Sequence, residues 1–354
     1  MSNDMIQVTF ADVMGNCDGQ EDIDCSNKGL TSLSGCPEKV RNFNCSGNQL
    51  TTLQWAPKKI KGDFNCSSNL LTSLYGAPEE VNGDFDCSNN QLISLEGGPV
   101  FIMGDFSCAG NQLTSFKSEH DDATMQCVLA GCPEVVEGDF NCSCNKLTTL
   151  DGGPHIVGGD FDCSGNQLVT LEGAPKKIQG DFDCSDNQLS TLSGSPNYIM
   201  GDFSCAGNQL TSLKGGAREV SGNFDCSGNQ LVSLKGSSKK INGIFDCSVN
   251  KLSFLKGAPE EVGAFICCNN QLTSLKWAPE KVKGNFDCSA NQLLSLEGVP
   301  KKVKGHFDCS KNRLSFLDGA LKKVGGDFIC GENAQLFDEE QIRLVCNVKG
   351  ICIV

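Results

Sequence analysis

A motif of the form Cys-Ser-x-Asn-x-Leu recurs along almost the whole chain, and this recurrence limits what the chain can fold into. Its cysteines, here called the anchor cysteines, lie 20 or 21 residues apart, except for one interval of 34 residues. A fixed period in this range is typical of a solenoid, in which each unit buries its apolar face only against its neighbours. The fifteen anchors are Cys25, Cys45, Cys66, Cys87, Cys108, Cys142, Cys163, Cys184, Cys205, Cys226, Cys247, Cys267, Cys288, Cys309 and Cys330.

The repeated unit reads L-x-x-L-x-G-x-P-x-x-[VI]-x-G-D-F-D-C-S-x-N-Q. In the third unit, Phe64 and Cys66 alternate with polar residues, which predicts a short strand with one buried face. Leu71 and Leu74 extend the same apolar set. Because the Gly-x-Pro stretch lacks an apolar i, i+3, i+4 pattern, the return segment is predicted to be extended or 3₁₀ rather than α-helical.

The composition follows from this repetition. The chain has 40 Gly and 23 Cys, and 20 Phe stand beside only 2 Trp and 2 Tyr, so a few positions have been copied many times. The first 16 residues lack the basic and apolar segments of a signal peptide, which favours a reduced, cytoplasmic protein over a disulfide scaffold. The anchor cysteines are therefore predicted to be small apolar core residues. One thiol per turn also cannot converge on a metal, so neither metal nor cofactor is expected.

The run [VI]-x(2–3)-F-x-C-x-x-N-x-L resembles the leucine-rich repeat, with Phe64 and Cys66 at its inner apolar positions and Asn69 at its asparagine position. The short unit is similar to the bacterial effector class of leucine-rich repeats (the YopM and IpaH families). Its sequence also resembles arrays encoded by tailed phages and large DNA viruses. The resemblance covers about residues 21–336. It departs in one respect, because most units carry an extra Gly before Asp-Phe, which only Val40–Phe43 and Val262–Phe265 lack.

This resemblance implies an α/β-solenoid leaning all-β: a curved leucine-rich repeat solenoid of about 15 turns. It would have one parallel β-sheet on the concave face and a mostly non-helical convex side. The asparagine at this position of each unit would use its side-chain amide to satisfy backbone groups of the turn. Residues 1–20 are expected to form an N-terminal cap, with a capping strand at Met5–Phe10. Residues 337–354 are expected to form a C-terminal cap, with an Asp-capped helix at Asp338–Asn347 and a short tail.

An insertion of 13 residues interrupts the array near residues 117–131. Its sequence begins with a capping serine and an acidic first turn and closes on a glycine, which predicts a structural helical turn. Two alternatives remain open. The segment could be a loop that contacts a partner, or a zinc site, although the spacing of its candidate ligands fits no known pattern: His120, Asp121, Asp122, Cys127 and Cys132.

Acidic residues occupy two columns that flank the Phe position on the expected concave face. Without these sixteen carboxylates, 27 acidic residues stand against 29 basic ones, so the columns account for the net charge of −14. That charge argues against direct binding of nucleic acid and predicts a basic protein partner; for the first column, hydrogen bonding to the backbone beside Gly is the alternative. Asp160, Asp162, Asp181 and Asp183 are the most regular binding candidates. The columns are Asp63, Asp84, Asp105, Asp139, Asp160, Asp181, Asp202 and Asp327 before Phe, and Asp24, Asp86, Asp162, Asp183, Asp225, Asp246, Asp287 and Asp308 after it.

The acidic columns are interrupted once, by apolar side chains in two consecutive units. Stacked strands would place these residues side by side as a patch inside a polar rim, which is typical of an interface. Neutral drift of one unit is the alternative. The patch comprises Ile244, Val249, Ala264, Ile266 and Cys268, and the rim comprises Asp225, Asp246, Asp287 and His306.

These features favour a non-enzymatic scaffold that binds a protein partner through its acidic face, with the partner basic or equipped with an apolar anchor. The viral and effector resemblance implies a modulator of host proteins. The alternative is an acidic mimic of nucleic acid that occupies a DNA- or RNA-binding protein. Catalysis is disfavoured, because His120, His155 and His306 fall in widely separated units. No apolar run reaches the ~20 residues of a membrane span, so no membrane partner is expected. The oligomeric state is left open.

Overall fold

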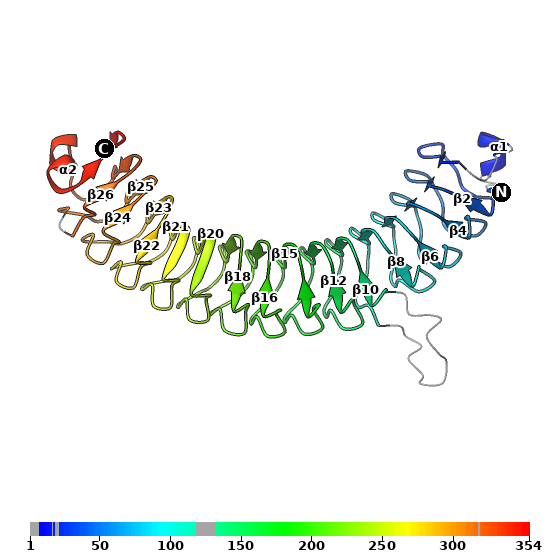
Figure 1. The fold of residues 1–354 in the computed structure, drawn as a ribbon, viewed down its shortest axis with the longest axis horizontal. Helices are drawn as coiled ribbons and strands as arrows, with labels where there is room; N and C mark the ends of the chain where they lie inside the picture. The colour runs from blue at the N-terminus through cyan, green and yellow to red at the C-terminus, as the bar shows by residue number, and fades with distance from the viewer. Residues whose placement is uncertain (1–6, 16, 18–20, 118–131, 318) are drawn as a thin grey trace, which may run out of the picture. The chain divides into compact units, whose positions relative to one another are not determined.

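The computed structural model describes residues 7–15, 17, 21–117, 132–317 and 319–354. They form two compact units, an N-terminal unit (Met1–Leu168 with Glu172–Gly180) and a C-terminal unit (Val169–Leu171 with Asp181–Val354). Each unit is a stack of parallel turns, and most turns contribute two short strands that pair with the equivalent strands of the neighbouring turn (Figure 1). The expected parallel β-solenoid of about 15 turns with very little helix is confirmed.

The first strand series, here called the Phe ladder, contains the Phe of each unit. In the N-terminal unit it comprises β1 (Ile23–Asp24), β3 (Phe43–Asn44), β5 (Phe64–Asn65), β7 (Phe85–Asp86), β9 (Phe106–Ser107), β11 (Phe140–Asn141) and β13 (Phe161–Asp162). In the C-terminal unit it comprises β15 (Phe182–Asp183), β17 (Phe203–Ser204), β19 (Phe224–Asp225), β23 (Phe286–Asp287), β25 (Phe307–Asp308), β27 (Phe328–Ile329) and β29 (Cys352–Ile353).

The second series, here called the Val ladder, contains the Val or Ile three or four residues earlier. In the N-terminal unit it comprises β2 (Lys39–Val40), β4 (Lys59–Ile60), β6 (Glu80–Val81), β8 (Phe101–Ile102), β10 (Val135–Val136), β12 (Ile156–Val157) and β14 (Lys177–Ile178). In the C-terminal unit it comprises β16 (Tyr198–Ile199), β18 (Glu219–Val220), β22 (Lys281–Val282), β24 (Lys302–Val303), β26 (Lys323–Val324) and β28 (Asn347–Val348). Two longer strands, β20 (Lys240–Asp246) and β21 (Glu261–Ile266), run through both ladders.

The core repeats the same five apolar positions in most turns. In the fourth turn these are Val81, Phe85, Cys87, Leu92 and Leu95, all of which are buried. The Phe rings of successive turns stack in a column, with ring centroids 5.5 Å apart between Phe64 and Phe85. Because each ring rests on the ring of the next turn, the core is continuous within each unit although no turn could bury its own apolar face.

A ladder of buried asparagines lies beside the Phe column, as the repeat pattern predicts. The side-chain amide of Asn69 donates to the carbonyl oxygens of Cys45 and Cys66, and its Oδ1 accepts the N–H of Leu50 at 3.0 Å. Each asparagine therefore joins two turns and satisfies backbone groups that have no strand partner. This contact explains why the repeat keeps asparagine at a buried position.

Both ends of the described chain carry short helices. Helix α1 (Phe10–Met14) begins where the sequence predicts a strand, and only a single parallel bridge joins Thr9 to Ser32. The strand prediction at Met5–Phe10 is thus wrong for its described part, because Thr9 caps a helix through Asp12. Helix α2 (Glu339–Val345) is capped by Asp338, as expected. The predicted tail forms strands instead, since β28 pairs with β26 and β29 pairs with β27.

The cysteines that the structure describes are all free thiols, and the anchor cysteines are buried. Several of their thiols donate to the next turn, as in the 3.3 Å contact from Cys87 Sγ to the Ser107 carbonyl oxygen. Within the described ranges, no group of three or more His, Cys, Asp or Glu side chains is arranged to hold a metal ion. No helix of the described chain is long and apolar enough to span a membrane.

Candidate functional site

The Asp column before Phe makes contacts between turns. Oδ1 of Asp63 accepts the backbone N–H of Asp84 at 3.0 Å, and Oδ1 of Asp84 accepts that of Asp105 at 2.9 Å. Asn42 and Asn223 stand in the same column and accept in the same way from the turns that follow. The structural alternative for this column therefore has direct support, since each side chain satisfies an N–H of the next turn.

This contact also explains the extra glycine of most units. A Cβ at Gly83 would collide with the Asp63 carboxylate and lie 2.7 Å from the backbone carbon of Gly62. The position before Asp thus has to be free of a side chain wherever the previous turn reaches across with a carboxylate or amide. The sequence shows the Gly-Asp pair but cannot show that the two residues serve neighbouring turns.

The Asp column after Phe has a structural role that the sequence analysis missed. Oδ1 of Asp86 accepts the N–H of Ser88 at 2.9 Å, and Oδ1 of Asp225 accepts that of Ser227 at 2.8 Å. Asn65 makes the same turn with Ser67. An Asp or Asn two residues before Ser is the signal for such a turn, and it was available in the Asp-Cys-Ser motif. Since Asn and Asp both accept this hydrogen bond, the turn does not explain why the column contains so many charged residues.

The carboxylates of both columns nevertheless remain exposed or half-buried. Most of them use one oxygen for the hydrogen bond to the backbone. In the N-terminal unit they line a groove of about 430 Å³ over β1, β3, β5 and β7, here called the acidic groove. Its charged lining residues are Asp22, Asp24, Asp63, Asp84 and Asp86. Of these, Asp22 is paired with Arg41, so four carboxylates lack a basic partner among the described residues.

The apolar gap in the acidic columns, here called the apolar patch, lies over β20 and β21. In the strand register Ile244 is opposite Ala264, and Ile266 is opposite Asp246 on one side and Asp287 on the other. The register thus brings Ile244 and Ala264 together, and the role of the patch as an interface stays a prediction. Ile244 exposes 42% of its surface, a large fraction for an isoleucine in a strand. The two strands pair from Lys240 to Asp246, with a bulge between Ile241 and Ile244.

The patch changes the electrostatics of its own rim. Burial raises the pKa of the Asp246 carboxyl, and the nearby Asp225 and Asp287 carboxylates raise it further, while its hydrogen bonds with Ser248 lower it. Burial also raises the pKa of the Cys268 thiol to about 11. Asp246 is therefore a partly desolvated carboxylate beside Ile266, an environment in which a cationic partner would be attracted more strongly than at an open surface.

Val249 holds an unfavourable backbone conformation inside the patch. The residue between Ser and Asn is left-handed in the turns described here, and most units place Gly, Asn, Asp or Ser there. Val249 has φ 53° and exposes 55% of its surface. A β-branched residue in this region costs about 1–3 kcal/mol. The fold gains no buried contact from this exposed side chain, so the cost lacks a structural explanation.

The remaining candidates lie at different distances along the stack. Asp225 pairs with Asp246 in the strand register and Asp287 with Ile266, so both adjoin the apolar patch. His306 is one turn further on, where its Nδ1 accepts the N–H of Asp327 at 3.1 Å. Two of the regular acidic candidates, Asp160 and Asp162, belong to the N-terminal unit, and the other two, Asp181 and Asp183, belong to the C-terminal unit. Of the zinc candidates only Cys132 is described, and it is buried; the predicted insertion helix lies outside the described residues.

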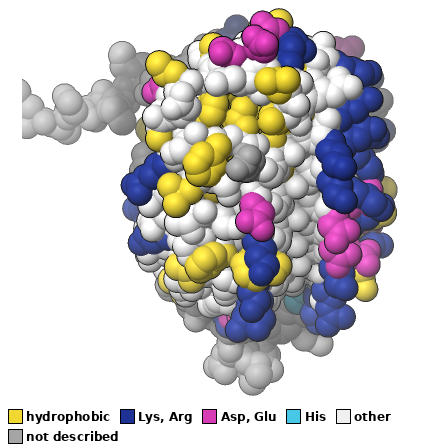
Figure 2. Space-filling model, turned by 90° about the vertical axis from the view of Figure 1, so that its left-hand side faces the viewer, with side chains coloured by type: hydrophobic (Ala, Val, Ile, Leu, Met, Phe, Trp, Pro, Cys, Tyr) yellow, Lys and Arg dark blue, Asp and Glu magenta, His cyan; other side chains and the backbone are white. Residues whose placement is uncertain are grey.

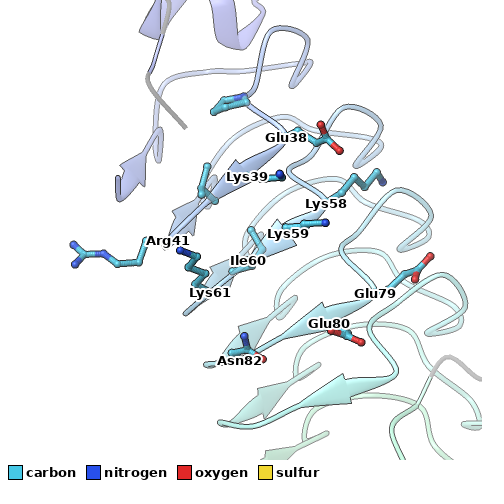
Figure 3. A pocket seen from close by; sticks show the side chains of 12 residues that line it. Glu38, Lys39, Arg41, Lys58, Lys59, Ile60, Lys61, Glu79, Glu80 and Asn82 are labelled. Carbon is cyan, nitrogen blue, oxygen red and sulfur yellow. The ribbon is translucent and has the colours of Figure 1, made fainter. Parts of the chain in front are cut away.

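A second groove, which the sequence analysis did not consider, lies on the Val ladder of the N-terminal unit. It measures about 830 Å³, and basic and acidic side chains project from β2, β4 and β6 around it (Figure 3). The available signal was the pair of charged residues before the Val or Ile of each unit, as in Lys58-Lys59-Ile60. Its charged lining is mixed: Glu38, Lys39, Arg41, Lys58, Lys59, Lys61, Glu79 and Glu80.

Comparison with known proteins supports the fold. No protein-family model matches the chain, and no curated protein matches its sequence. Among solved structures, YopM from Yersinia enterocolitica superposes with a TM-score of 0.65 at 22% identity, covering 88% of this chain and 64% of YopM. The leucine-rich effector YopM from Yersinia pestis superposes with a TM-score of 0.53 at 18% identity, covering 88% of both chains. This chain therefore spans less than two thirds of the Yersinia enterocolitica protein.

A third solved structure is the functional domain of InlJ from Listeria monocytogenes, which includes a cysteine ladder. It superposes with a TM-score of 0.52 at 18% identity. The alignment covers 91% of this chain and 69% of the InlJ domain. These likenesses and the repeat geometry establish a leucine-rich repeat fold. The resemblance to phage and viral arrays remains a prediction.

Proposed function

We propose that the protein is a protein-binding scaffold whose Phe-ladder face takes a basic partner, with an apolar side chain of that partner seated on the apolar patch. The observation that carries the proposal is the patch itself. It places Ile244, Val249 and Ile266 at the surface beside Asp246, whose carboxyl has a raised pKa. A small apolar centre with a charged rim is the arrangement in which a few residues dominate binding.

The strained Val249 supports a binding role over neutral drift. A drifting position would be expected to return to Gly or Asn, since either removes the backbone cost. The acidic rim supports a cationic partner, because carboxylates on consecutive turns repel each other unless a counter-charge binds between them. The likeness to bacterial effector proteins supports a partner in a host cell, and a viral or pathogen origin belongs to the same proposal.

The test uses short Lys- and Arg-rich peptides that differ only in a central Leu or Ala, with binding followed by fluorescence anisotropy. The Leu peptide is expected to bind more tightly than the Ala peptide, and the affinity of both to fall at about 0.5 M NaCl, where the Debye length is only a few ångströms. An Ile244→Asp/Ile266→Asp variant should bind the Leu peptide with about 30-fold lower affinity, which is the effect of losing a central apolar contact.

The matched control is Val232→Asp/Leu294→Asp, which changes two exposed apolar residues of the same unit outside the ladders. It should bind the Leu peptide like the unmodified chain. Equal losses in both double variants, or no preference for Leu over Ala, would remove the patch from the proposal.

A second candidate, the nucleic-acid mimic, follows from the density of carboxylates in the acidic columns. Two per turn at a strand spacing of about 4.8 Å is one charge per ~2.4 Å, compared with one per ~1.7 Å along duplex DNA. In that case a DNA-binding protein would be captured by the chain and released by duplex DNA. Replacing Asp160, Asp162, Asp181 and Asp183 by Asn would abolish the capture, whereas Ile244→Asp would leave it unchanged.

A further inference from the structure

Six lysines gather on the Val ladder of the C-terminal unit, and we call them the lysine strip. They flank the buried valines of β24, β26 and β28, and Lys302 lies opposite Lys323 in the strand register. Figure 2, which faces the end of this unit that carries α2, shows Lys and Arg side chains in a strip down one side. Like charges on paired strands destabilise a sheet, so the strip needs an explanation. Its members are Lys301, Lys302, Lys304, Lys322, Lys323 and Lys349.

The lysine strip differs from the stretch of the same ladder around β20, β21 and β22. Where β21 meets β22, Glu261 pairs with Lys281 and Lys283 at 3.7 and 2.7 Å, and Lys239 pairs with Glu260 at 3.8 Å. The groove of the N-terminal unit likewise mixes glutamates with its lysines. By contrast, none of the six strip lysines forms an ion pair with any residue that the structure describes. The strip is therefore an unneutralised cationic surface on a chain of net charge −14.

We propose that the lysine strip binds the acidic groove of a second copy of this chain. Charge complementarity is the first argument. Four carboxylates of the groove lack a basic partner among the described residues: Asp24, Asp63, Asp84 and Asp86. The total charge of each copy does not prevent this contact, because at physiological ionic strength charges more than about 8 Å apart are largely screened.

Equal spacing is the second argument for a second copy as the occupant. Both charge arrays are built on parallel strands of the same repeat, so both advance by about 4.8 Å per turn. Several lysines can therefore meet several carboxylates in register, which an unrelated anion would match only by coincidence. The strip also contains no arginine, whose planar group favours bidentate recognition of phosphate. Because the two surfaces belong to different parts of the chain, the contact is heterologous, and such contacts join molecules into rings or open chains.

The experiment is sedimentation velocity on the full chain at several concentrations. In about 0.05 M NaCl the chain should form oligomers whose size grows with concentration, and in about 0.5 M NaCl it should be monomeric. A strip variant, Lys302→Glu/Lys304→Glu/Lys323→Glu, should be monomeric at low salt. A groove variant, Asp63→Asn/Asp84→Asn/Asp86→Asn, should be monomeric too. It should also keep its fold, because Asn42, Asn223 and Asn65 accept the same hydrogen bonds in other turns.

Mixing the two variants gives the decisive result. One retains only a functional groove and the other only a functional strip, so the mixture should form a 1:1 dimer and nothing larger. The control Lys214→Glu/Lys235→Glu/Lys256→Glu makes the same charge change at exposed positions outside the ladders and should still assemble.

Three outcomes overturn the proposal. They are a chain that is monomeric at low salt, a mixture that stays monomeric, and a control that dissociates as completely as the strip variant. Binding of phosphatidylserine vesicles or duplex DNA through the same lysines by a monomeric chain would assign the strip to phosphate instead. Peptide binding at the apolar patch is unaffected by the strip variant, so this test is independent of the proposed function.

Discussion

At the scale of the residue, the two oxygens of each column aspartate have different neighbours. One oxygen holds a backbone N–H, as in the contact of Asp86 with Ser88, and an asparagine does this equally well in other turns. In Asp86 the other oxygen contributes only charge, whereas in Asp202 it also accepts the side-chain amide of Asn223. Substitution of Asp by Asn therefore separates folding from electrostatics within a single side chain.

Val249 gives the first prediction at this scale. Val249→Gly should raise the free energy of unfolding by about 1 kcal/mol, because glycine adopts φ 53° without a steric cost. Urea denaturation measures the change. The same variant should weaken binding of the Leu-containing basic peptide. An unchanged stability would show that the left-handed conformation costs this valine nothing.

Asp246 gives a prediction about pH. Its pKa in the folded chain is raised above the ordinary value of 3.8. The folded state is therefore favoured by this group below pH 3.8, and that stability is lost as the pH rises through the folded-state pKa. Asp246→Asn keeps the acceptor for Ser248 and should raise the thermal midpoint at pH 7, with no gain near pH 3.5.

Asp86→Asn is the control for this measurement, because Asp86 makes the same turn between two polar neighbours, Asn65 and Ser107. A similar gain at pH 7 for both variants would point to general charge repulsion and away from burial of Asp246.

At the scale of the element, each turn depends on the one before it. The side chain before Phe reaches forward, and the following turn carries glycine where that side chain arrives. At β21 this pattern stops, because Ala264 has no oxygen to reach forward. A Cβ at Gly284 in the next turn would come no nearer than 3.0 Å to the Gly263 carbonyl oxygen and 3.6 Å to the Ala264 Cβ.

This difference predicts unequal effects of the same substitution in neighbouring turns. Gly305→Ala should destabilise the chain by about 2 kcal/mol, because its Cβ would strike the Asn285 side chain and lie 2.7 Å from the backbone carbon of Gly284. Gly284→Ala should change the free energy of unfolding by less than about 1 kcal/mol. Urea midpoints of the two variants test this, and equal losses would contradict the contact as its cause.

The sequence predicts these elements unevenly. Buried positions such as Phe64, Cys66 and Asn69 follow from periodicity, because their environment repeats with the unit. The forward contact of Asp63 could not be deduced, since a period shows that residues are equivalent without showing which neighbouring turn each one serves. The β-strand Cys352–Ile353 was missed for a related reason: it joins the Phe ladder without carrying the Phe-x-Cys motif.

At the scale of the whole molecule, the two ladders differ in the charges that they carry. Asp carboxylates flank the Phe ladder, whereas the Val ladder carries both glutamates and lysines and has the lysine strip over β24, β26 and β28. A single net charge hides this separation, and for that reason the sequence analysis predicted the acidic surface and overlooked the lysine strip. The apolar patch was predicted because its members interrupt a column that is otherwise regular.

The thiols also behave as a set. Burial raises the pKa of anchor thiols such as Cys87 and Cys226, whereas Cys144 is exposed. Iodoacetamide at pH 8 should therefore modify Cys144 first among the described cysteines. A pKa of about 11 leaves Cys268 with roughly 100-fold less thiolate than an ordinary cysteine, so it should react far more slowly.

Mass spectrometry of native and urea-treated samples reads out each site. The anchors should be labelled only after unfolding. Labelling of Cys87 in the native chain would mean that the turns open readily.

The forward-reaching side chain has a consequence for how such a chain can change over generations. Most turns present the same acceptor to the next turn and the same gap to the previous one, so any two turns that keep Gly-Asp or Gly-Asn can be joined. Ile102–Ser115 and Ile199–Ser212 are identical in sequence, as duplication of whole turns would leave them. Unequal recombination can therefore lengthen or shorten this protein in steps of one turn, because the contact between turns stays the same. Selection can then act on the length of the solenoid alone.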